Sequence, residues 1–388
     1  MRDRAQAEPT TPADRRPPFQ CIALMLQGGG ALGAYQGGVY QALSEANLHP
    51  DWVAGISIGS VNAAIIAGNP PETRVDKLRA FWESITSAPL VDSLSSVWLS
   101  GTEGDAARKS VNQISAAAVL TAGVSGFFRP RLPPPLFQLP GSPGATSFYD
   151  TQPLIRTLER LVDFDRINEG PMRFSAGSTN VRTGNFIYFD STVRKIGPAH
   201  ILASGALPPG FPAIEIDGEH YWDGGLVSNT PLQWVLQFGP RQDTLAFEVD
   251  LWSAHGRFPR NIMEVATREK EIQYSSRTRD NTDRFGDTQR IRHAVAKLID
   301  ALPSEFKNRT DVASLSTFGD RKVYNIVHLI YRTQRYEGDS KDFDFSRLSM
   351  NDHWTAGYND TLRTLRHPEA LQRPAGSDGL AIFDFADL

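Results

Sequence analysis

Cysteine is nearly absent from this chain of 388 residues, which contains only Cys21. One cysteine cannot form an intrachain disulfide, and it excludes zinc sites built from several cysteines. Long apolar runs are also missing, since none approaches the roughly 20 residues that a membrane-spanning helix needs. Neither sign of charge is in large excess: the formal net charge is −4, so we expect no nucleic-acid partner.

The first 18 residues lack the apolar segment of a secretory signal and are instead polar, charged and rich in proline. Such a composition buries too little apolar surface to fold, so we expect a disordered leader over residues 1–18. These features predict a cytoplasmic location and leave peripheral membrane contact open. The chain as a whole has an ordinary 40% of hydrophobic residues, enough for a substantial core.

Two strand–turn–helix units stand at the start of the folded region. Residues 21–26 and 51–57 are short apolar stretches typical of buried strands. Residues 34–46 and 60–68 follow them with helical spacing or a continuous apolar face. Two such units in close succession predict an α/β protein with a mainly parallel central sheet.

The amino-acid composition changes twice in the later part of the chain. Residues 93–145 are rich first in alanine, serine and glycine and then in proline, which indicates an insertion or lid. Residues 260–299 are strongly charged with a helical pattern, and we expect a solvated helix pair there. We divide the chain into a catalytic domain at 19–256 and a C-terminal extension at 257–388. Further strands are predicted at 172–181, 185–191, 244–252 and 322–331.

The segment "GISIGS" places Ser57 between a predicted strand and a predicted helix, flanked by Gly55 and Gly59. This context is the one that a nucleophile elbow requires. Glycine is needed on both sides because side chains there would collide in so tight a turn. The pattern G-x-S-x-G also occurs by chance, so a structural turn is the alternative.

The glycine run at Gly28–Gly30 permits two interpretations. Together with Gly33 it matches G-x-G-x-x-G, the turn of a dinucleotide site, which would make the protein an NAD-dependent oxidoreductase. That site needs an acid at the end of the second strand, about 20 residues on, whereas Asp51 stands at the beginning of that strand. An acyl-transfer site uses such a loop differently, because bare backbone N–H groups there can stabilise an oxyanion.

A nucleophilic serine needs a base, and none of the eight histidines is a clean candidate. Asp223 in "YWDGGLVSNTPL" is followed by Gly224 and Gly225, which indicates a carboxylate presented on a constrained turn. A direct Ser–Asp dyad would need no histidine, while a plain turn between strands is the alternative. His220 and Asp223 lack a third ligand nearby in sequence, so we expect no metal site.

Three segments together resemble one family. "LMLQGGGALGAYQGGV", "GISIGS" and "DGG" are similar, in order and spacing, to the signatures of the patatin-like phospholipases, over about residues 21–250. The resemblance implies a three-layer α/β/α fold with a largely helical C-terminal extension. It implies lipid acyl hydrolysis through an acyl-enzyme, with Ser57 as nucleophile and Asp223 as proton acceptor. It also implies no metal or cofactor. The glycines that it assigns are Gly28, Gly29 and Gly30 for the oxyanion hole, with Gly55, Gly59 and Gly224 supporting the motifs.

One position departs from the family pattern. Leu32 stands where the family often has arginine or lysine in the glycine loop. This leaves the substrate open between phospholipids or lysophospholipids and neutral lipid esters. The segment Phe127–Phe137 is expected either to line an acyl channel or to be a plain insertion. A catalytically quiet patatin-like scaffold is the alternative function. The expected partners are a lipid or acyl ester and, transiently, a membrane surface, while the oligomeric state stays undetermined.

Overall fold

The computed structural model describes residues 16–86, 105–334, 336–338, 340–374 and 379–385. Most of the predicted leader, residues 1–15, lies outside the described residues, as does the start of the predicted insertion up to residue 104. At the beginning of the described chain, Arg16 forms an ion pair with Asp51, and Pro17 is buried.

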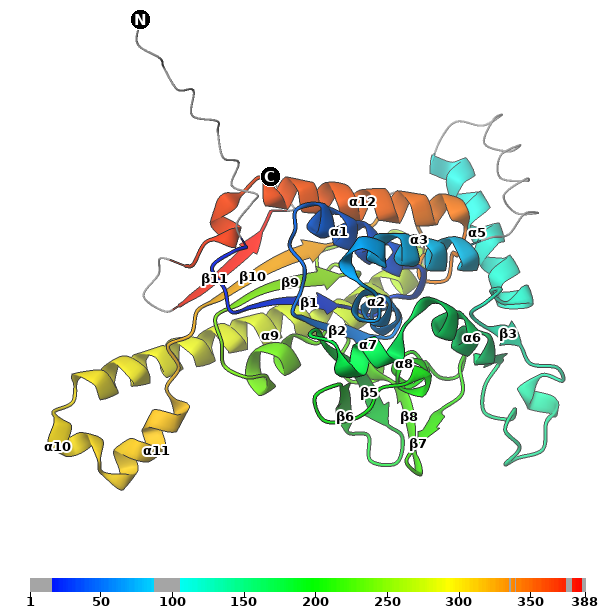
Figure 1. Cartoon of the computed structure of the whole chain (residues 1–388). Helices are drawn as coiled ribbons and strands as arrows, with labels where there is room; N and C mark the ends of the chain where they lie inside the picture. The colour runs from blue at the N-terminus through cyan, green and yellow to red at the C-terminus, as the bar shows by residue number, and fades with distance from the viewer. Residues whose placement is uncertain (1–15, 87–104, 335, 339, 375–378, 386–388) are drawn as a thin grey trace, which may run out of the picture.

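A nine-stranded, mostly parallel sheet forms the centre of the molecule (Figure 1). The strand order is β11-β10-β9-β1-β2-β5-β8-β7, with β6 paired to β5. The strands from β11 to β5 run parallel, and β6, β7 and β8 add antiparallel pairings. This confirms the predicted α/β class with a mainly parallel central sheet. The bounds are β1 Cys21–Leu26, β2 Trp52–Ile56, β5 Arg173–Asn180, β6 Phe186–Asp190, β7 Ile214–Ile216, β8 Glu219–Asp223, β9 Thr244–Asp250, β10 Tyr324–Ile330 and β11 Leu380–Asp384.

Helices cover both faces of this sheet because β1 is apolar on both sides. Ile22, Leu24 and Leu26 belong to the core cluster under one helical layer, whereas Ala23 and Met25 belong to the cluster that includes Phe285 of the long helix α9. The result is a three-layer arrangement. The first layer contains α1 Ala34–Glu45, α2 Ile58–Ala67, α3 Arg74–Ile85, α6 Gln152–Leu161, α7 Phe164–Glu169, α8 Pro198–Ser204 and α12 Arg347–Leu365, and the second contains α9 Ile262–Ala301.

Helix α12, late in the sequence, packs closely along α1 near the start (Figure 1). A Cβ atom on Gly38 would lie 1.9 Å from the Trp354 carbonyl oxygen, and one on Gly357 would lie 2.0 Å from that of Tyr35. Only glycine therefore permits this helix crossing. Strands β10 and β11 join the sheet beside β9, so the C-terminal segment shares the core of the N-terminal one.

Two expectations about helices were wrong. Residues 260–299 do not form a helix pair, because α9 continues as one helix from Ile262 to Ala301, ending before Pro303. Gly286 is the one glycine inside it and is tolerated. The sequence interpretation also missed α5, Asp105–Ala122, within the predicted insertion. Its alanine content, taken there as a sign of irregular structure, favours helix.

The rest of the insertion region forms a small antiparallel pair, β3 Arg129–Pro130 and β4 Tyr149–Asp150. A two-helix projection, α10 Ser304–Lys307 and α11 Thr310–Phe318, lies at the far end of α9 (Figure 1). None of the helices in the described ranges is long and apolar enough to cross a membrane.

Candidate active site

Ser57 lies at the turn from β2 into α2, with a backbone conformation that serine rarely adopts, φ 55° and ψ −126°. The turn is as tight as the sequence pattern predicts. A Cβ atom on Gly55 would lie 2.2 Å from the Gly59 carbonyl oxygen, and one on Gly59 would lie 2.2 Å from that of Leu26. Such strain persists only where surrounding structure enforces it, and it is concentrated at functional sites.

Ser204, in the last turn of α8, helps to hold this strained turn. The Ser57 backbone N–H donates to the Ser204 hydroxyl at 3.0 Å and to its carbonyl oxygen at 3.2 Å. The Ser204 hydroxyl in turn donates to the Gly177 carbonyl at 2.7 Å, which links the turn to β5. Ser204 is fully buried, and its hydrogen bonds make the geometry of Ser57 depend on α8 and β5.

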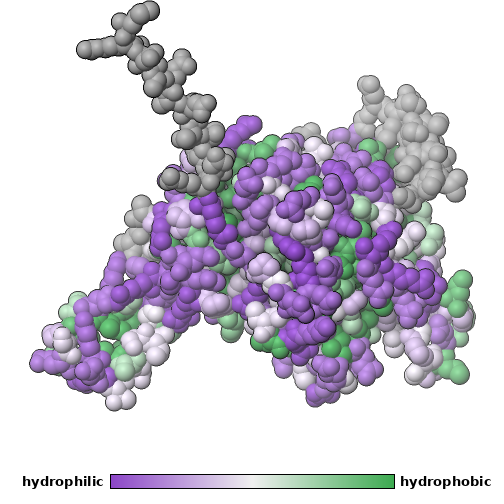
Figure 2. Space-filling view, in the orientation of Figure 1, coloured by the Kyte–Doolittle hydropathy of each residue, from purple (hydrophilic) through white to green (hydrophobic). Residues whose placement is uncertain are grey.

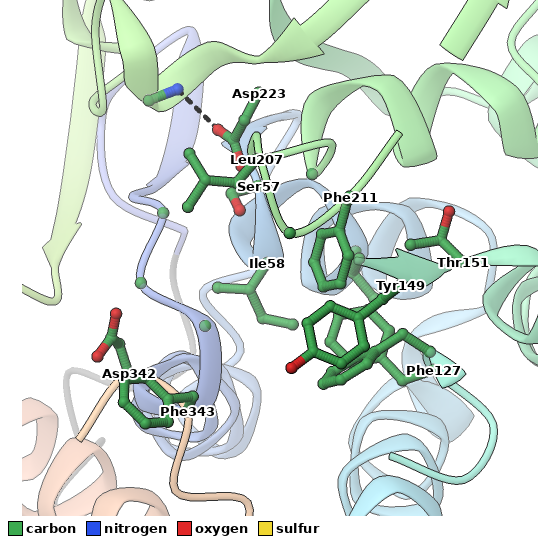
Figure 3. Close-up of a pocket in the computed structure, with 18 of the residues that line it drawn as sticks. Ser57, Ile58, Phe127, Tyr149, Thr151, Leu207, Phe211, Asp223, Asp342 and Phe343 are labelled. Atoms are coloured by element: carbon green, nitrogen blue, oxygen red, sulfur yellow. Dashed lines mark hydrogen bonds between the residues drawn. The ribbon is translucent and has the colours of Figure 1, made fainter. Parts of the chain in front are cut away.

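Asp223 ends β8 and lies beside Ser57 (Figure 3). Strand pairing brings them together, because Asp223 is in register with Ser178 of β5, whose neighbour Gly177 is in register with Ile56 of β2. The carboxylate is only 2% exposed and accepts a 2.7 Å hydrogen bond from the Gly225 N–H. Burial raises the pKa of Asp223 to about 6, against the opposing effect of hydrogen bonds from Ser57 and Gly225.

The glycine loop after β1 faces the same point. The Gly28 carbonyl accepts hydrogen bonds from the Asn229 amide and the Trp252 indole, each at 2.9 Å. The Gly28 N–H lies 3.4 Å from the Asn229 carbonyl oxygen. Within the described part of the chain, the N–H groups of Gly29 and Gly30 have no hydrogen-bond acceptor. These two groups are therefore available to a bound molecule.

Gly30 has a left-handed conformation, φ 56°, and a Cβ atom there would lie 2.1 Å from the Asp342 carbonyl oxygen. That same oxygen accepts a 2.8 Å hydrogen bond from the Ala31 N–H. The preceding residue, Gln27, is fully buried, and its side-chain oxygen accepts from the N–H groups of Leu251 and Trp252 at 2.6 and 3.0 Å. The loop is thus fixed from both ends before any substrate binds.

Sequence reasoning missed the residues that fix the loop: Gln27, Asn229, Trp252 and Asp342. Gln27 gave a usable signal, because an amide directly after an apolar strand is costly to bury unless it is hydrogen-bonded. Asn229 lies a few residues beyond Asp223, within the quoted segment, but nothing in its spacing marks it as a partner of Gly28. Asp342 comes from the C-terminal segment, more than 300 residues from the loop.

A largely apolar cavity of about 330 Å³ opens at Ser57 and Asp223. Aromatic rings from several segments meet in its wall, among them Phe127 and Phe211 (Figure 3). The ring centres of Phe127 and Phe211 lie 6.2 Å apart, and those of Phe128 and Phe211 lie 5.1 Å apart. Among the described residues that line it, Asp223 and Asp342 supply the carboxylates, and there is no lysine, arginine or histidine.

Asp342 lies at the glycine-loop side of this cavity (Figure 3). The Lys270 ammonium contacts its carboxylate at 3.0 Å. Burial nevertheless raises the pKa of Asp342, with Lys270 opposing the rise. Leu32 has no part in the wall, since it is fully buried in the hydrophobic core. A cation at position 32 would therefore not face this cavity.

Asp51, the acidic residue that a dinucleotide site would need, is engaged in other contacts and lies at the wrong end of β2. The Asp51 carboxylate accepts a 2.7 Å hydrogen bond from the Ile22 N–H and pairs with Arg16. It lies just before β2, whereas Ser57 follows the other end of that strand. His220, considered with Asp223 as a metal ligand, is exposed on β8.

These features define a class of α/β proteins in which a serine on a strained strand–helix turn faces a buried carboxylate and a glycine loop. The family model of the patatin-like phospholipases matches residues 24–235, more than half of the chain. A second model, described as patatin phospholipase, matches residues 272–377. The chain therefore belongs to the patatin-like phospholipase family and is a lipid ester hydrolase, as the resemblance implied.

Similar solved structures share little sequence with this chain. VipD from Legionella pneumophila is 13% identical with a TM-score of 0.38, over 95% of this chain and 75% of its own. ExoU from Pseudomonas aeruginosa, in complex with SpcU, is 18% identical with a TM-score of 0.24, over 77% and 60%. A second ExoU structure is 15% identical with a TM-score of 0.23, and the match covers 77% of this chain and 69% of that one. None of the curated proteins compared with the chain matches it significantly.

The pKa of Asp223 predicts a pH-dependent cost in stability. The folded chain holds this proton up to about pH 6, against an ordinary value of 3.8, so its stability falls as pH rises between these values. Asp223→Asn should raise the free energy of unfolding by up to about 3 kcal/mol at pH 8 and by little at pH 4. Urea unfolding at both pH values measures this.

Asp217→Asn is the matched control, because this carboxylate lies in the adjacent hairpin turn with its side chain 82% exposed. It should show no such gain at pH 8. An Asp223→Asn variant that is no more stable than wild type at pH 8 would contradict the assignment of a desolvated carboxylate.

Proposed function

We propose that this chain hydrolyses carboxylic esters of lipids through a Ser57–Asp223 dyad and a covalent acyl-enzyme. The observation that supports it most directly is the strained Ser57 beside the buried Asp223 at the mouth of an apolar cavity. An apolar wall suits an acyl chain, and the polar groups are gathered where the ester would lie. Under this proposal residues 19–256 form the acyl hydrolase domain, with 257–388 as an extension that shares its sheet.

Acylation begins when the Ser57 oxygen attacks the ester carbonyl carbon while Asp223 accepts the proton of the Ser57 hydroxyl. The carbonyl oxygen becomes an oxyanion, which the N–H groups of the glycine loop stabilise. Gly29 and Gly30 supply unengaged donors, and Gly28 contributes by releasing its long contact to Asn229. The N-terminus of α2, which starts directly after Ser57, favours negative charge at this position.

The tetrahedral intermediate then collapses and the alcohol leaves, taking the proton from Asp223. In the second half, Asp223 accepts a proton from water, whose oxygen attacks the acyl-enzyme carbonyl carbon. Collapse releases the fatty acid and returns the proton to Ser57. A pKa of about 6 suits both roles, because the carboxylate is ionised near neutral pH and still takes up a proton readily.

Ser57→Ala and Asp223→Asn should each lower kcat for a p-nitrophenyl ester by at least about a thousandfold. The first removes the nucleophile and the second removes its base, and neither residue of the dyad acts without the other. Wild-type kcat/KM should rise with pH through about 6, as Asp223 loses its proton. A fluorophosphonate probe should label wild type at Ser57 and leave Ser57→Ala unlabelled.

The Asp217→Asn variant, folded and with its dyad intact, should retain full activity in the same assay. Undiminished hydrolysis by folded Ser57→Ala would refute the dyad. Labelling of wild type without turnover on a broad ester panel would favour the catalytically quiet scaffold instead.

The charges around the cavity favour a neutral ester over an anionic phospholipid. A phosphate group near the glycine loop would meet the Asp342 carboxylate, and the described wall offers it no cationic side chain. Lys270 contacts the Asp342 carboxylate but does not line the cavity, and its ammonium offsets the charge of Asp342 in part. We infer that glycerides or simple acyl esters are hydrolysed faster than phospholipids with the same acyl chains.

Asp342→Asn should shift this preference, because it removes one negative charge and leaves the Lys270 ammonium nearby. The ratio of kcat/KM for an anionic phospholipid to that for a diglyceride, in matched mixed micelles, should rise about five- to tenfold. Asp287→Asn, an exposed carboxylate paired with Arg290 on α9, is the control and should leave the ratio unchanged. An unchanged ratio in Asp342→Asn would remove Asp342 from substrate selection.

An exposed apolar loop between β3 and β4 supports contact with a lipid surface. Leu132, Leu136, Phe137 and Leu139 are 80–87% exposed. Figure 2 shows hydrophobic residues at the edge of the molecule where Figure 1 places this loop. Beyond it, the N–H of Tyr149 donates to the Gly210 carbonyl at 2.9 Å, which ties the loop to the cavity wall. We propose that it inserts its side chains among lipids while a substrate molecule enters.

The double variant Leu136→Asp/Phe137→Asp should therefore reduce activity on vesicle-borne ester at least tenfold, since charged side chains do not enter the lipid phase. Activity on a soluble short-chain ester should stay unchanged. Val193→Asp, which alters another exposed apolar side chain, is the control and should keep both activities. Equal loss on both substrates would indicate a damaged fold rather than lost docking, and undiminished vesicle activity would contradict docking.

A further inference from the structure

A second cluster of ionisable side chains lies outside the proposed active site, on neighbouring strands β9 and β10. Glu248 and His328 are paired in the parallel register, and Asp250 follows on the same face of β9. The His328 Nδ1 atom lies 3.2 Å from Glu248 Oε2 and 4.0 Å from Asp250 Oδ2. One ligand atom from each of the three residues lies within 4.8 Å of the other two.

The cluster is buried. Glu248 is 0% exposed and Asp250 2%, while the His328 side chain is 10% exposed. Neither carboxylate oxygen of Glu248, nor Oδ1 of Asp250, receives a hydrogen bond from the described residues. In the same ranges, no lysine or arginine forms an ion pair with either carboxylate. Asp384 of β11, in register with His328, adds a further negative charge nearby.

Two adjacent carboxylates cannot both stay ionised in such a place without a cation, because burying an uncompensated charge costs several kcal/mol. Accordingly, burial and the neighbouring carboxylates raise the pKa values of both Glu248 and Asp250. The compensating charge must come from bound protons, from a protonated His328 or from a metal ion. Only a divalent ion neutralises both carboxylates and takes a lone pair from the imidazole at once.

The spacing also matches a metal. Tetrahedral ligands about 2.0–2.1 Å from zinc lie about 3.3 Å from one another. The separations from His328 to the two carboxylates, 3.2 and 4.0 Å, bracket this value. The donor set of one imidazole and two carboxylates is one that zinc accepts, with a fourth position left for water.

We propose that Glu248, Asp250 and His328 bind one divalent transition-metal ion, with zinc as the ion that their chemistry matches best. The ion would join β9 to β10 and so fasten the C-terminal segment to the central sheet. The role is structural, since these side chains are absent from the cavity at Ser57.

The test uses the full chain, freed of metal with a chelator and then exposed to ZnCl₂. Mass spectrometry of the desalted protein should find close to one zinc per chain. The melting temperature should rise by about 5 °C at zinc concentrations well above the dissociation constant. Glu248→Gln should lose both effects, because it keeps the size of the side chain but not its charge.

Two controls keep the outcome clear. Metal-free Glu248→Gln should melt at or above metal-free wild type, since it replaces a buried carboxylate by a neutral amide. His220→Gln, which removes an exposed histidine, should retain both the bound zinc and the shift. No zinc uptake by wild type would overturn the proposal. So would an undiminished shift in Glu248→Gln, or loss of the shift in His220→Gln. Neither readout involves ester hydrolysis.

Discussion

The strained turn at Ser57 is the constraint on which the rest of the site depends. A serine with φ 55° is not stable by itself, and it is held here by Gly55 and Gly59, by the hydrogen bonds to Ser204 and by the start of α2. Each of these supports belongs to the packed core. The local strain is therefore offset by burial elsewhere, and the backbone at Ser57 is held in this one conformation.

The order of the strands in the sheet brings the glycine loop, Ser57 and Asp223 together. Strand β1 lies between β9 and β2, so the glycine loop that follows it emerges next to Ser57. Trp252, just beyond β9, reaches the Gly28 carbonyl, and Asp223 arrives from the opposite direction on antiparallel β8. The C-terminal segment then completes the loop through the Asp342 carbonyl. The site is consequently a product of the whole sheet rather than of one motif.

Sequence reasoning succeeded where the relevant physics is local. The alternation of apolar strands and helices predicted the sheet, and the glycines around Ser57 predicted the tight turn, because both follow from neighbouring residues. Helix α5 was missed although its alanine content favours helix, because alanine, serine and glycine together were interpreted as an insertion. The continuity of α9 was missed because a charged helical pattern does not show whether it forms one helix or two. Asn229, Trp252 and Asp342 could not be predicted either, since pairing between distant strands sets their contacts with the loop.

Buried carboxylates illustrate the same limit. In the sequence, the two glycines after Asp223 indicated a carboxylate on a constrained turn, with a plain turn between strands as the alternative, whereas Glu248 and Asp250 look like polar interruptions of a strand. Only the register of β9 with β10 puts His328 beside them, 80 positions from Glu248. The surroundings then separate the two cases. Asp223 borders an open, largely apolar cavity and lies beside the Ser57 hydroxyl, whose proton it accepts in the mechanism that we propose. Glu248 and Asp250 have no such hydroxyl beside them within the described chain. A counter-ion that neutralises the two carboxylates is therefore a better explanation for them than a catalytic role.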